Sequence, residues 1–396
     1  MMMEKIKRVQ ALLKEENIEG WLLYDFQKRN FLAVEFLEIP SSHFLTRRFF
    51  YWIPVKGDPV KIVHATESHV LETLPGKTIT YFKRETLEEE VKKLLQGLSS
   101  VAMEYSPRNA IPSLSLVDGG TLDLIRESVP KIVSSANFVQ EFTCVLTPLQ
   151  RESHLQAAHI LDQTVEAAWD FLGKQLKAEE KITEYDVQQF IALKLQKEGC
   201  IFEGGPICAV NDNSSNPHYS PTREKHREIR KGDFILIDLW AKKKEQDSIY
   251  ADICRVGVAD TQATKKQEEI FSLVKKTQEE ATDLVCQRFQ EKKPIRGYEV
   301  DLAARKVIEE ASLGSYFIHR TGHNIYTQDH GPGTHMDSLE TYDDRLILPR
   351  TCFSIEPGIY LPGEFGIRLE YDVFVTQEGN VEISGGVQVE IKKILK

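Results

Sequence analysis

The chain has 396 residues, of which 41% are hydrophobic and 28% are charged, and its formal net charge is −10. This length and composition favour a globular protein with two domains, and the negative charge argues against a surface that binds nucleic acid or anionic membranes. No apolar run approaches the ~20 residues that span a bilayer, and the charged start, MMMEKIKRVQALLKEENIEG, lacks the apolar core of a signal peptide. We therefore expect a cytoplasmic protein whose partners are neither nucleic acid nor membranes.

The first 140 or so residues alternate between helical and strand patterns. Apolar spacing predicts a helix from Met3 to Leu13, and the run GWLLYD predicts a strand. RRFFYWIPV and VKIVHA predict a hairpin that turns at Gly57 and Asp58. TLEEEVKKLLQGL predicts an amphipathic helix that ends at Gly97, and SVAMEY predicts a short strand. We expect a small α/β domain with a mixed sheet.

After this region the pattern changes to long helices separated by strand-like runs. Four stretches have the apolar spacing, the starts or the stops of helices, and they cover residues 149–176, 183–199, 270–289 and 300–311. We place the boundary near residue 145 and expect one domain at 1–145 and a second at 146–396.

Four acidic residues of the second half interrupt runs that otherwise read as buried strands. They are Asp238 in FILID, Asp252 in IYADICR, Glu356 in CFSIEPG and Glu370 in GIRLEYD. FILIDLW and IYADICRVGV could form one antiparallel hairpin, and CFSIEPGIYL and GIRLEYDVFV another, so that each hairpin carries two acids. Two such hairpins meeting face to face would bring the four carboxylates together.

Acidic side chains are almost never fully buried unless they are paired or bind a metal, and four of them suggest a shared partner. Two divalent cations would neutralise four carboxylates, and a neutral histidine, His323 in HRTGHN, would add a nitrogen ligand. A water between two such cations loses a proton readily and becomes a nucleophile. One acid of this kind is usually an exposed strand end, but the joint pattern favours a hydrolytic site for two metals, with amide bonds as the target.

These motifs resemble those of the pita-bread metallopeptidases, the group of proline-specific aminopeptidases, prolidases and methionine aminopeptidases. The resemblance covers about 150–396, and the front part resembles the creatinase-type domain of the proline-specific branch. It implies an α/β (α+β) fold, with a creatinase-like N-terminal α/β domain before a C-terminal pita-bread catalytic domain. The metal ligands it implies are Asp238 in IDLWA, Asp252 in YADICR, His323 in TGHN, Glu356 in SIEPGIY and Glu370 in IRLEYDVFVT.

The resemblance also implies further roles, one position at a time. His218 in NPHYSP would line the substrate pocket, His330 would steady the carbonyl oxygen in the transition state, and Glu356 would also transfer a proton. His319 and Arg368 would hold the proline or carboxylate end of the substrate, a feature of the proline-specific branch. From residue type alone, Arg368 is equally an anion clamp or a structural counter-ion among the acids.

Several positions depart from the family pattern. Trp240 stands where the family commonly has a glycine, Tyr326 replaces a usual glycine after His323, and Gly331 replaces the usual acid after His330. The first hairpin is also longer than usual and contains the insertion KKKEQ. The family pattern has no counterpart for His335, which we expect in a surface loop.

The six cysteines are scattered and form no CxxC pair, so we expect free thiols in a reducing compartment. Cys254 follows Asp252 by two residues, and we expect it to be buried beside the site rather than reactive.

The function implied is that of a metallo-exopeptidase that hydrolyses Xaa-Pro bonds by a metal-bridging hydroxide, as an Xaa-Pro aminopeptidase or a prolidase (Xaa-Pro dipeptidase). Its cofactors would be two divalent ions, with Mn²⁺ first and Co²⁺, Fe²⁺ or Zn²⁺ as alternatives. Its substrates would be peptides with proline at the second position, and the family also implies a homodimer. The alternatives are a methionine aminopeptidase-like enzyme, a metal-free creatinase-like hydrolase, or a catalytically silent pita-bread module that binds proteins.

Overall fold

The computed structural model describes residues 2–396, and the chain divides into two compact units, Met1–Thr143 and Cys144–Lys396. Each unit is considered by itself. The first contains β1 Gly20–Asp25, β2 Phe49–Pro54, β3 Val60–His64, β4 Lys77–Tyr81, β5 Ser100–Met103 and β6 Lys131–Ser134. Its α-helices are α1 Met2–Glu15, α2 Phe31–Phe36, α3 Arg84–Leu95, α4 Gly119–Arg126 and α5 Ala136–Thr143.

The strands of the first unit form one mixed sheet in the order β4-β3-β2-β1-β5-β6, as its sequence pattern predicted. Side chains alternate across this sheet because successive residues of a strand point to opposite faces. Trp21 and Leu23 of β1 pack in the core that α1, α2 and α5 cover, whereas Leu22 and Tyr24 pack in the core of α3 and α4. The predicted hairpin turn is also present, with Gly57 at φ 104°.

The second unit has four long helices, α6 Pro148–Lys177, α7 Glu184–Lys197, α8 Lys265–Gln290 and α9 Gly297–Glu310. Its first strands are β7 Ile182–Thr183, β8 Cys200–Ile201, β9 Ile207–Val210, β10 Glu228–Ile229, β11 Phe234–Lys243 and β12 Ala251–Val258. The later strands are β13 Asn324–Ile325, β14 Cys352–Ile355, β15 Gly358–Leu361, β16 Phe365–Arg368, β17 Tyr371–Val375, β18 Val381–Ser384 and β19 Lys392–Lys393.

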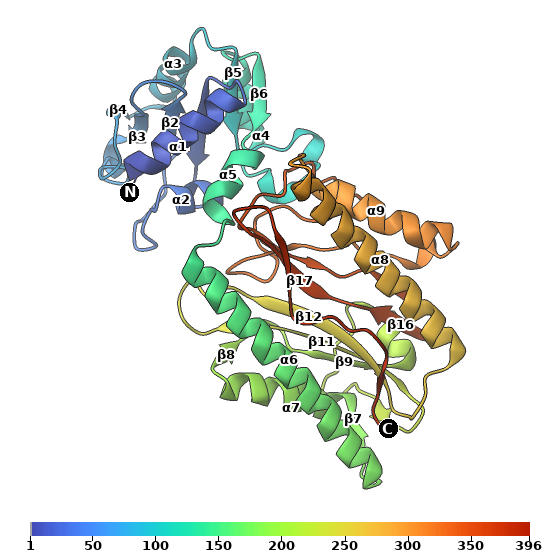
Figure 1. Ribbon diagram of the computed structural model, residues 1–396. Coiled ribbons are helices and arrows are strands. Elements are labelled where there is room, and N and C mark those ends of the chain that lie inside the picture. Colours follow the sequence, from blue (N-terminus) through green and yellow to red (C-terminus); the bar gives the residue numbers. More distant parts are fainter. Residues whose placement is uncertain (1) are drawn as a thin grey trace. The chain divides into compact units, whose positions relative to one another are not determined.

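The central strands of this unit lie between two pairs of helices (Figure 1). Ile235 and Ile237 of β11 pack in the core formed with α6 and α7. Phe234 and Leu236 point to the opposite face and pack in the core formed with α8 and α9. The strand is apolar on both faces for this reason, so an acid within it interrupts a buried run.

Both predicted hairpins form. In the first, β11 pairs with β12 over Phe234 to Ala241. In the second, β14 pairs with β17 and β15 pairs with β16, and the two ladders are separated at Glu356 and Glu370. The hairpins are joined by an antiparallel bridge between Cys254 and Glu370. They therefore meet edge to edge at this point, rather than through the stacked faces that the sequence pattern suggested.

All six cysteines have free thiols, and Cys254 is buried, as expected. Within residues 2–396, no helix combines the length and the apolar character that crossing a membrane would require.

Candidate metal centre

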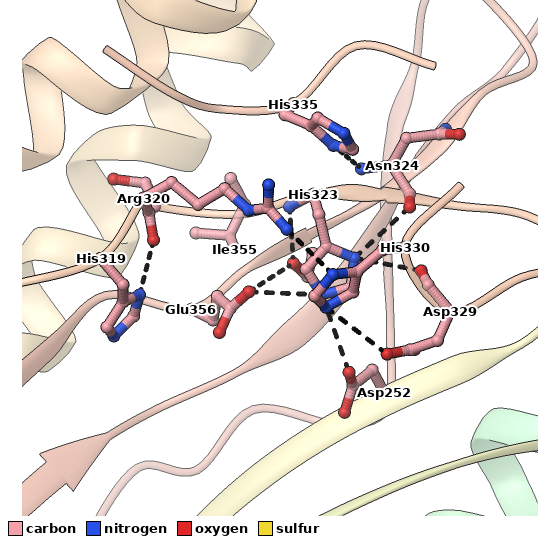
Figure 2. A network of polar contacts seen from close by, with 12 residues as sticks. Asp252, His319, Arg320, His323, Asn324, Asp329, His330, His335, Ile355 and Glu356 are labelled. Carbon is pink, nitrogen blue, oxygen red and sulfur yellow. Dashed lines mark hydrogen bonds and ion pairs between the residues drawn. The ribbon is translucent and has the colours of Figure 1, made fainter. Parts of the chain in front are cut away.

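One pocket of about 350 Å³ in the second unit gathers every site residue that the sequence predicted. The five predicted metal ligands line it, and so do the four residues expected to contact substrate, which are His218, His319, His330 and Arg368. Figure 2 shows how several of these side chains converge from strands and loops that lie far apart in the sequence. Their proximity makes the pocket the candidate site, whereas their individual roles stay predictions.

Strand register explains how the first two acids come together. Asp238 pairs with Cys254 and Trp240 pairs with Asp252, so the two aspartates are diagonal neighbours across β11 and β12. Diagonal neighbours of this kind share one face of the ladder and lie within reach of a common ligand. The backbone N–H of Glu370 donates to the carbonyl of Cys254 at 3.3 Å, which brings a third acid to the same place.

His323 is oriented so that one ring nitrogen faces the acids. Its Nδ1 lies 3.1 Å from the carbonyl oxygen of Asp329, and because a carbonyl only accepts, Nδ1 carries the proton. Its Nε2 lies 3.3 Å from Glu356 Oε1 and 3.8 Å from Asp252 Oδ2 (Figure 2). Burial holds the pKa of His323 well below its ordinary value. The imidazole therefore presents a lone pair to carboxylates, the arrangement of a metal-binding histidine.

Several carboxylate oxygens in the pocket lack a hydrogen-bond donor. Asp238 Oδ1, Asp252 Oδ1 and Glu370 Oε1 are all buried and unpartnered, in residues that are at most 5% exposed. Burial, reinforced by repulsion between neighbouring acids, raises the pKa of Asp252 and Glu370 well above the ordinary range. Unpaired buried carboxylates are costly, and a divalent cation removes this cost. The donor set therefore fits hard or borderline divalent metals.

Arg368 already has partners within the protein. It pairs with Asp238, its Nη1 donates to the Tyr360 hydroxyl at 3.2 Å, and its Nε lies 3.8 Å from Glu356. His319 Nε2 lies 2.7 Å from the same hydroxyl, so Tyr360 links the two residues that were expected to hold the substrate. Arg368 acts here as a counter-ion, while its Nε has no hydrogen-bond acceptor.

Two further histidines lie at the rim of the pocket. His330 is exposed, and its ring lies 4.1 Å from that of His323. Its Nδ1 is 3.0 Å from Nη2 of Arg320, a residue that the sequence analysis did not single out. His218 is exposed and also lines the pocket. Arg320 lies between His319 and His323 in HRTGHN, and this position between two predicted site residues could have identified it from the sequence.

The surface-loop expectation for His335 is wrong. This residue is half-buried, and its Nδ1 accepts a hydrogen bond from the backbone N–H of Asn324, next to His323. The contact fixes the backbone beside the predicted ligand. Only the folded path of loop 326–351 brings His335 there, and no local pattern in GPGTHMD indicates it.

Trp240, which stands where the family commonly has a glycine, lines the pocket, as do Ile207 and Pro217. Its indole Nε1 donates to the carbonyl of Glu203 at 3.0 Å, which fixes the ring as a wall. A tryptophan at this position therefore forms part of the pocket wall and leaves the acids in place.

The chain is similar in sequence to several dipeptidases. Over 206 residues the chain is 31% identical to the probable dipeptidase PepE of Mycobacterium tuberculosis, covering 51% of this chain and 50% of the relative. Over 189 residues it is 34% identical to the Xaa-Pro dipeptidase of Lactobacillus helveticus, covering 47% and 46%. The chain thus spans about half the length of the curated relatives it matches.

Solved structures match over nearly the whole chain. The prolidase of Thermococcus sibiricus aligns with a TM-score of 0.59 at 23% identity, over 99% of both chains. The dipeptidase PepE of Mycobacterium ulcerans aligns with a TM-score of 0.66 at 19% identity, over 99% of this chain and 98% of that one. The predicted fold class, an N-terminal α/β domain followed by a pita-bread domain, is confirmed. The model of metallopeptidase family M24 matches residues 152–377, and the chain belongs to this family.

Proposed function

We propose that this chain is a dinuclear metal-dependent dipeptidase that cleaves the bond between an N-terminal residue and proline. The observation that supports it most is the set of buried, donor-free carboxylate oxygens around the free Nε2 of His323. Membership of a metallopeptidase family implies a site for two metals, and relatives named Xaa-Pro dipeptidase favour proline at the second position.

The residues proposed to hold the two cations are Asp238, Asp252, His323, Glu356 and Glu370. Mn²⁺ is our first candidate, and Co²⁺, Fe²⁺ and Zn²⁺ also suit a set rich in oxygen ligands. When bound, a pair of divalent cations supplies Lewis-acid chemistry, because it lowers the pKa of water and polarises a carbonyl.

The protein's own side chains would supply proton transfer and charge stabilisation. Glu356 faces the pocket, and its carboxyl group is placed to take and give a proton there. In our proposal it delivers a proton to the prolyl nitrogen as the amide bond breaks. His330, positioned by Arg320, donates a hydrogen bond to the carbonyl oxygen as negative charge develops there.

A dipeptide with proline at the second position ends in a free carboxylate. The pocket contains cationic and hydrogen-bonding groups that could bind it. Arg368, with Tyr360 and His319 beside it, is the proposed clamp, through the guanidinium N–H that has no acceptor. A volume of about 350 Å³ suits a ligand of dipeptide size. Homodimer formation, implied only by the family resemblance, remains part of this proposal.

The test is hydrolysis of Ala-Pro by protein reconstituted with Mn²⁺, compared with Ala-Pro-Ala, Ala-Ala and Met-Ala-Ala. We expect cleavage of Ala-Pro, and loss of cleavage on chelation and in the Asp252→Ala variant. Preference for Ala-Ala would assign a dipeptidase without proline specificity, and preference for Met-Ala-Ala would favour the methionine aminopeptidase alternative. Binding of two Mn²⁺ ions with no turnover of any peptide would favour the catalytically silent module.

A further inference from the structure

A fifth carboxylate, that of Asp329, faces the same pocket as the four predicted acidic ligands. Its Oδ1 is buried and has no hydrogen-bond partner, while its Oδ2 lies 3.7 Å from His330 Nε2. Among residues 2–396, no lysine or arginine forms an ion pair with it. A half-buried acid with one buried oxygen and no cationic partner calls for an explanation.

The geometry connects Asp329 directly to His323. The Asp329 carbonyl oxygen accepts the Nδ1 proton of His323 at 3.1 Å, which turns Nε2 of the ring toward the acids. The potential ligand atoms of His323, Asp329 and His330 all lie within 4.8 Å of one another, and so do those of Asp252, His323 and Glu370. His323 belongs to both groups, and Figure 2 shows the Asp329 side chain near Asp252, close to the two imidazole rings.

The backbone explains why the acid stands before His330 and not after it. Gly331 stands where the family usually has an acid, and a Cβ atom there would lie 2.4 Å from Asn324 Oδ1 and 2.8 Å from Tyr326 Cβ. Asn324 is held in place because its Nδ2 donates to the carbonyl of Cys352 at 2.8 Å. No side chain can therefore be accommodated at 331 unless this segment moves, whereas Asp329 points into the pocket.

The net charge of the pocket is also consistent with a fifth acidic ligand. The four predicted acidic ligands balance two divalent cations, but Arg368 adds one further positive charge at Asp238. The carboxylate of Asp329 balances that guanidinium, so that the loaded centre would be close to neutral. Near-neutrality favours a buried site, because an uncompensated charge in a low-dielectric environment is costly.

We propose that Asp329 is an additional acidic ligand of the metal centre and binds the cation that His323 holds. The inference rests on the proposed function, since it requires a metal at His323. It concerns this chain's own loop, in which Asp329 and His330 adjoin and both face the ring of His323.

The test is Mn²⁺ binding to the full chain, measured by titration calorimetry after the metal has been removed by chelation and dialysis. The variants are Asp329→Asn, and Asp344→Asn as a matched control that removes the same charge from an exposed residue outside the pocket. We expect Asp329→Asn to weaken one of the two binding steps by about a hundredfold or more, since loss of a residue that only orients a ligand already costs about tenfold to a hundredfold. The control should bind as the unmodified protein does.

A second measurement separates a ligand from a structural residue. Because Asp329 has no cationic partner in the protein, the metal-free Asp329→Asn variant should melt at the same temperature as the metal-free parent, or higher. The visible absorption of bound Co²⁺, which depends on ligand number, should change in Asp329→Asn and not in Asp344→Asn. Unchanged Mn²⁺ affinity in Asp329→Asn, or a lower melting temperature of its metal-free form, overturns the inference and leaves the proposed function standing. Failure of the parent protein to bind Mn²⁺ refutes the proposed function itself.

Discussion

Two buried glutamates of the second unit illustrate opposite ways to place a carboxylate inside a protein. Glu184, fully buried at the start of α7, accepts hydrogen bonds from Val210 N at 2.7 Å, Arg227 N at 2.6 Å and the Tyr219 hydroxyl at 2.5 Å. Glu370 is 2% exposed, and its Oε1 has no donor at all. The first carboxylate is satisfied by the fold, whereas the second is left for a ligand.

The difference teaches that burial alone does not identify a functional acid. A carboxylate with several donors stabilises the fold, because each charge-assisted hydrogen bond offsets part of its desolvation cost. A carboxylate without donors costs free energy until something binds it. Among the described residues, four of the five buried carboxylate oxygens without a donor line the pocket, and the fifth belongs to Asp372, whose other oxygen accepts from the backbone N–H of Asp252.

The largest expected effect comes from Glu370→Gln. This change should lower peptidase activity by about a thousandfold, because metal catalysis supplies several kcal/mol of transition-state stabilisation. The metal-free variant should unfold at the same urea concentration as the metal-free parent, or at a higher one, because a donor-free charge has been removed. Activity assays and urea denaturation with a chelator present provide the check. A clear loss of stability in the metal-free form would break the comparison.

Glu184→Ala should lower the stability of the fold and leave metal binding and activity nearly unchanged, which is the opposite of the effect expected for Glu370→Gln. Loss of this carboxylate leaves buried donors unsatisfied, and we expect a loss of about 3 kcal/mol or more in the free energy of unfolding. Metal stoichiometry and activity per folded molecule should stay near those of the parent. Urea denaturation and metal analysis of the folded fraction test this, and loss of metal at full stability would contradict it.

The sequence predicted the second unit's helices and its acid-bearing hairpins well, because their apolar spacing is regular and long. It also identified Asp238 and Glu370, since an acid within an apolar strand is a visible exception. Tyr360 and Asp329 escaped attention, because a tyrosine in an apolar run and an acid in a polar loop are ordinary locally. Only the tertiary fold places Asp329 in the pocket and the Tyr360 hydroxyl against His319 and Arg368.

The contrast between satisfied and unsatisfied groups extends to histidines. His154 is fully buried, and its two ring nitrogens contact the carbonyl oxygen of Tyr250 at 2.7 Å and the hydroxyl of Ser384 at 2.6 Å. Both nitrogens therefore have a carbonyl or hydroxyl partner, whereas Nε2 of His323 faces only carboxylates. Burial lowers the pKa of His154 to about 4, from 6.5 in the unfolded chain.

Because the unfolded chain binds this proton more readily, stability should fall as the pH falls from 6.5 toward 4. We expect a loss of about 2 kcal/mol at pH 5 relative to pH 7 from His154 alone. Urea denaturation of the metal-free parent at both pH values, compared with His154→Gln, isolates this contribution. Equal pH dependence of the two proteins would show that His154 is not the group responsible.

A variant of Arg368 would show whether a residue that already pairs with Asp238 also binds the substrate. If its free Nε–H binds the substrate carboxylate, Arg368→Ala should raise KM for Ala-Pro by about 30-fold, since hydrogen bonds to charged groups contribute ~1.5–3 kcal/mol. Metal content should change little, because the cations would replace Arg368 as the partner of Asp238. Kinetics and metal analysis on one preparation decide the matter. Loss of metal at unchanged KM would make Arg368 a structural counter-ion only.

The smallest effect concerns Trp240, the aromatic wall of the pocket. Trp240 lies on the same face of β11 as Asp238, and its indole is fixed by the hydrogen bond to Glu203. Trp240→Ala should enlarge the apolar part of the pocket without removing a predicted ligand.

We expect this variant to raise kcat/KM for Leu-Pro relative to Ala-Pro by about tenfold, since one or more methylenes in an apolar pocket are worth ~1–3 kcal/mol. Trp240→Phe, which keeps most of the wall but loses the hydrogen bond, is the control and should stay near the parent ratio. If both variants change the ratio equally, the position of the ring, fixed by its hydrogen bond, matters more than its bulk. If neither does, the wall does not contact the N-terminal residue of the substrate, and selectivity must come from other residues that line the pocket, such as His218.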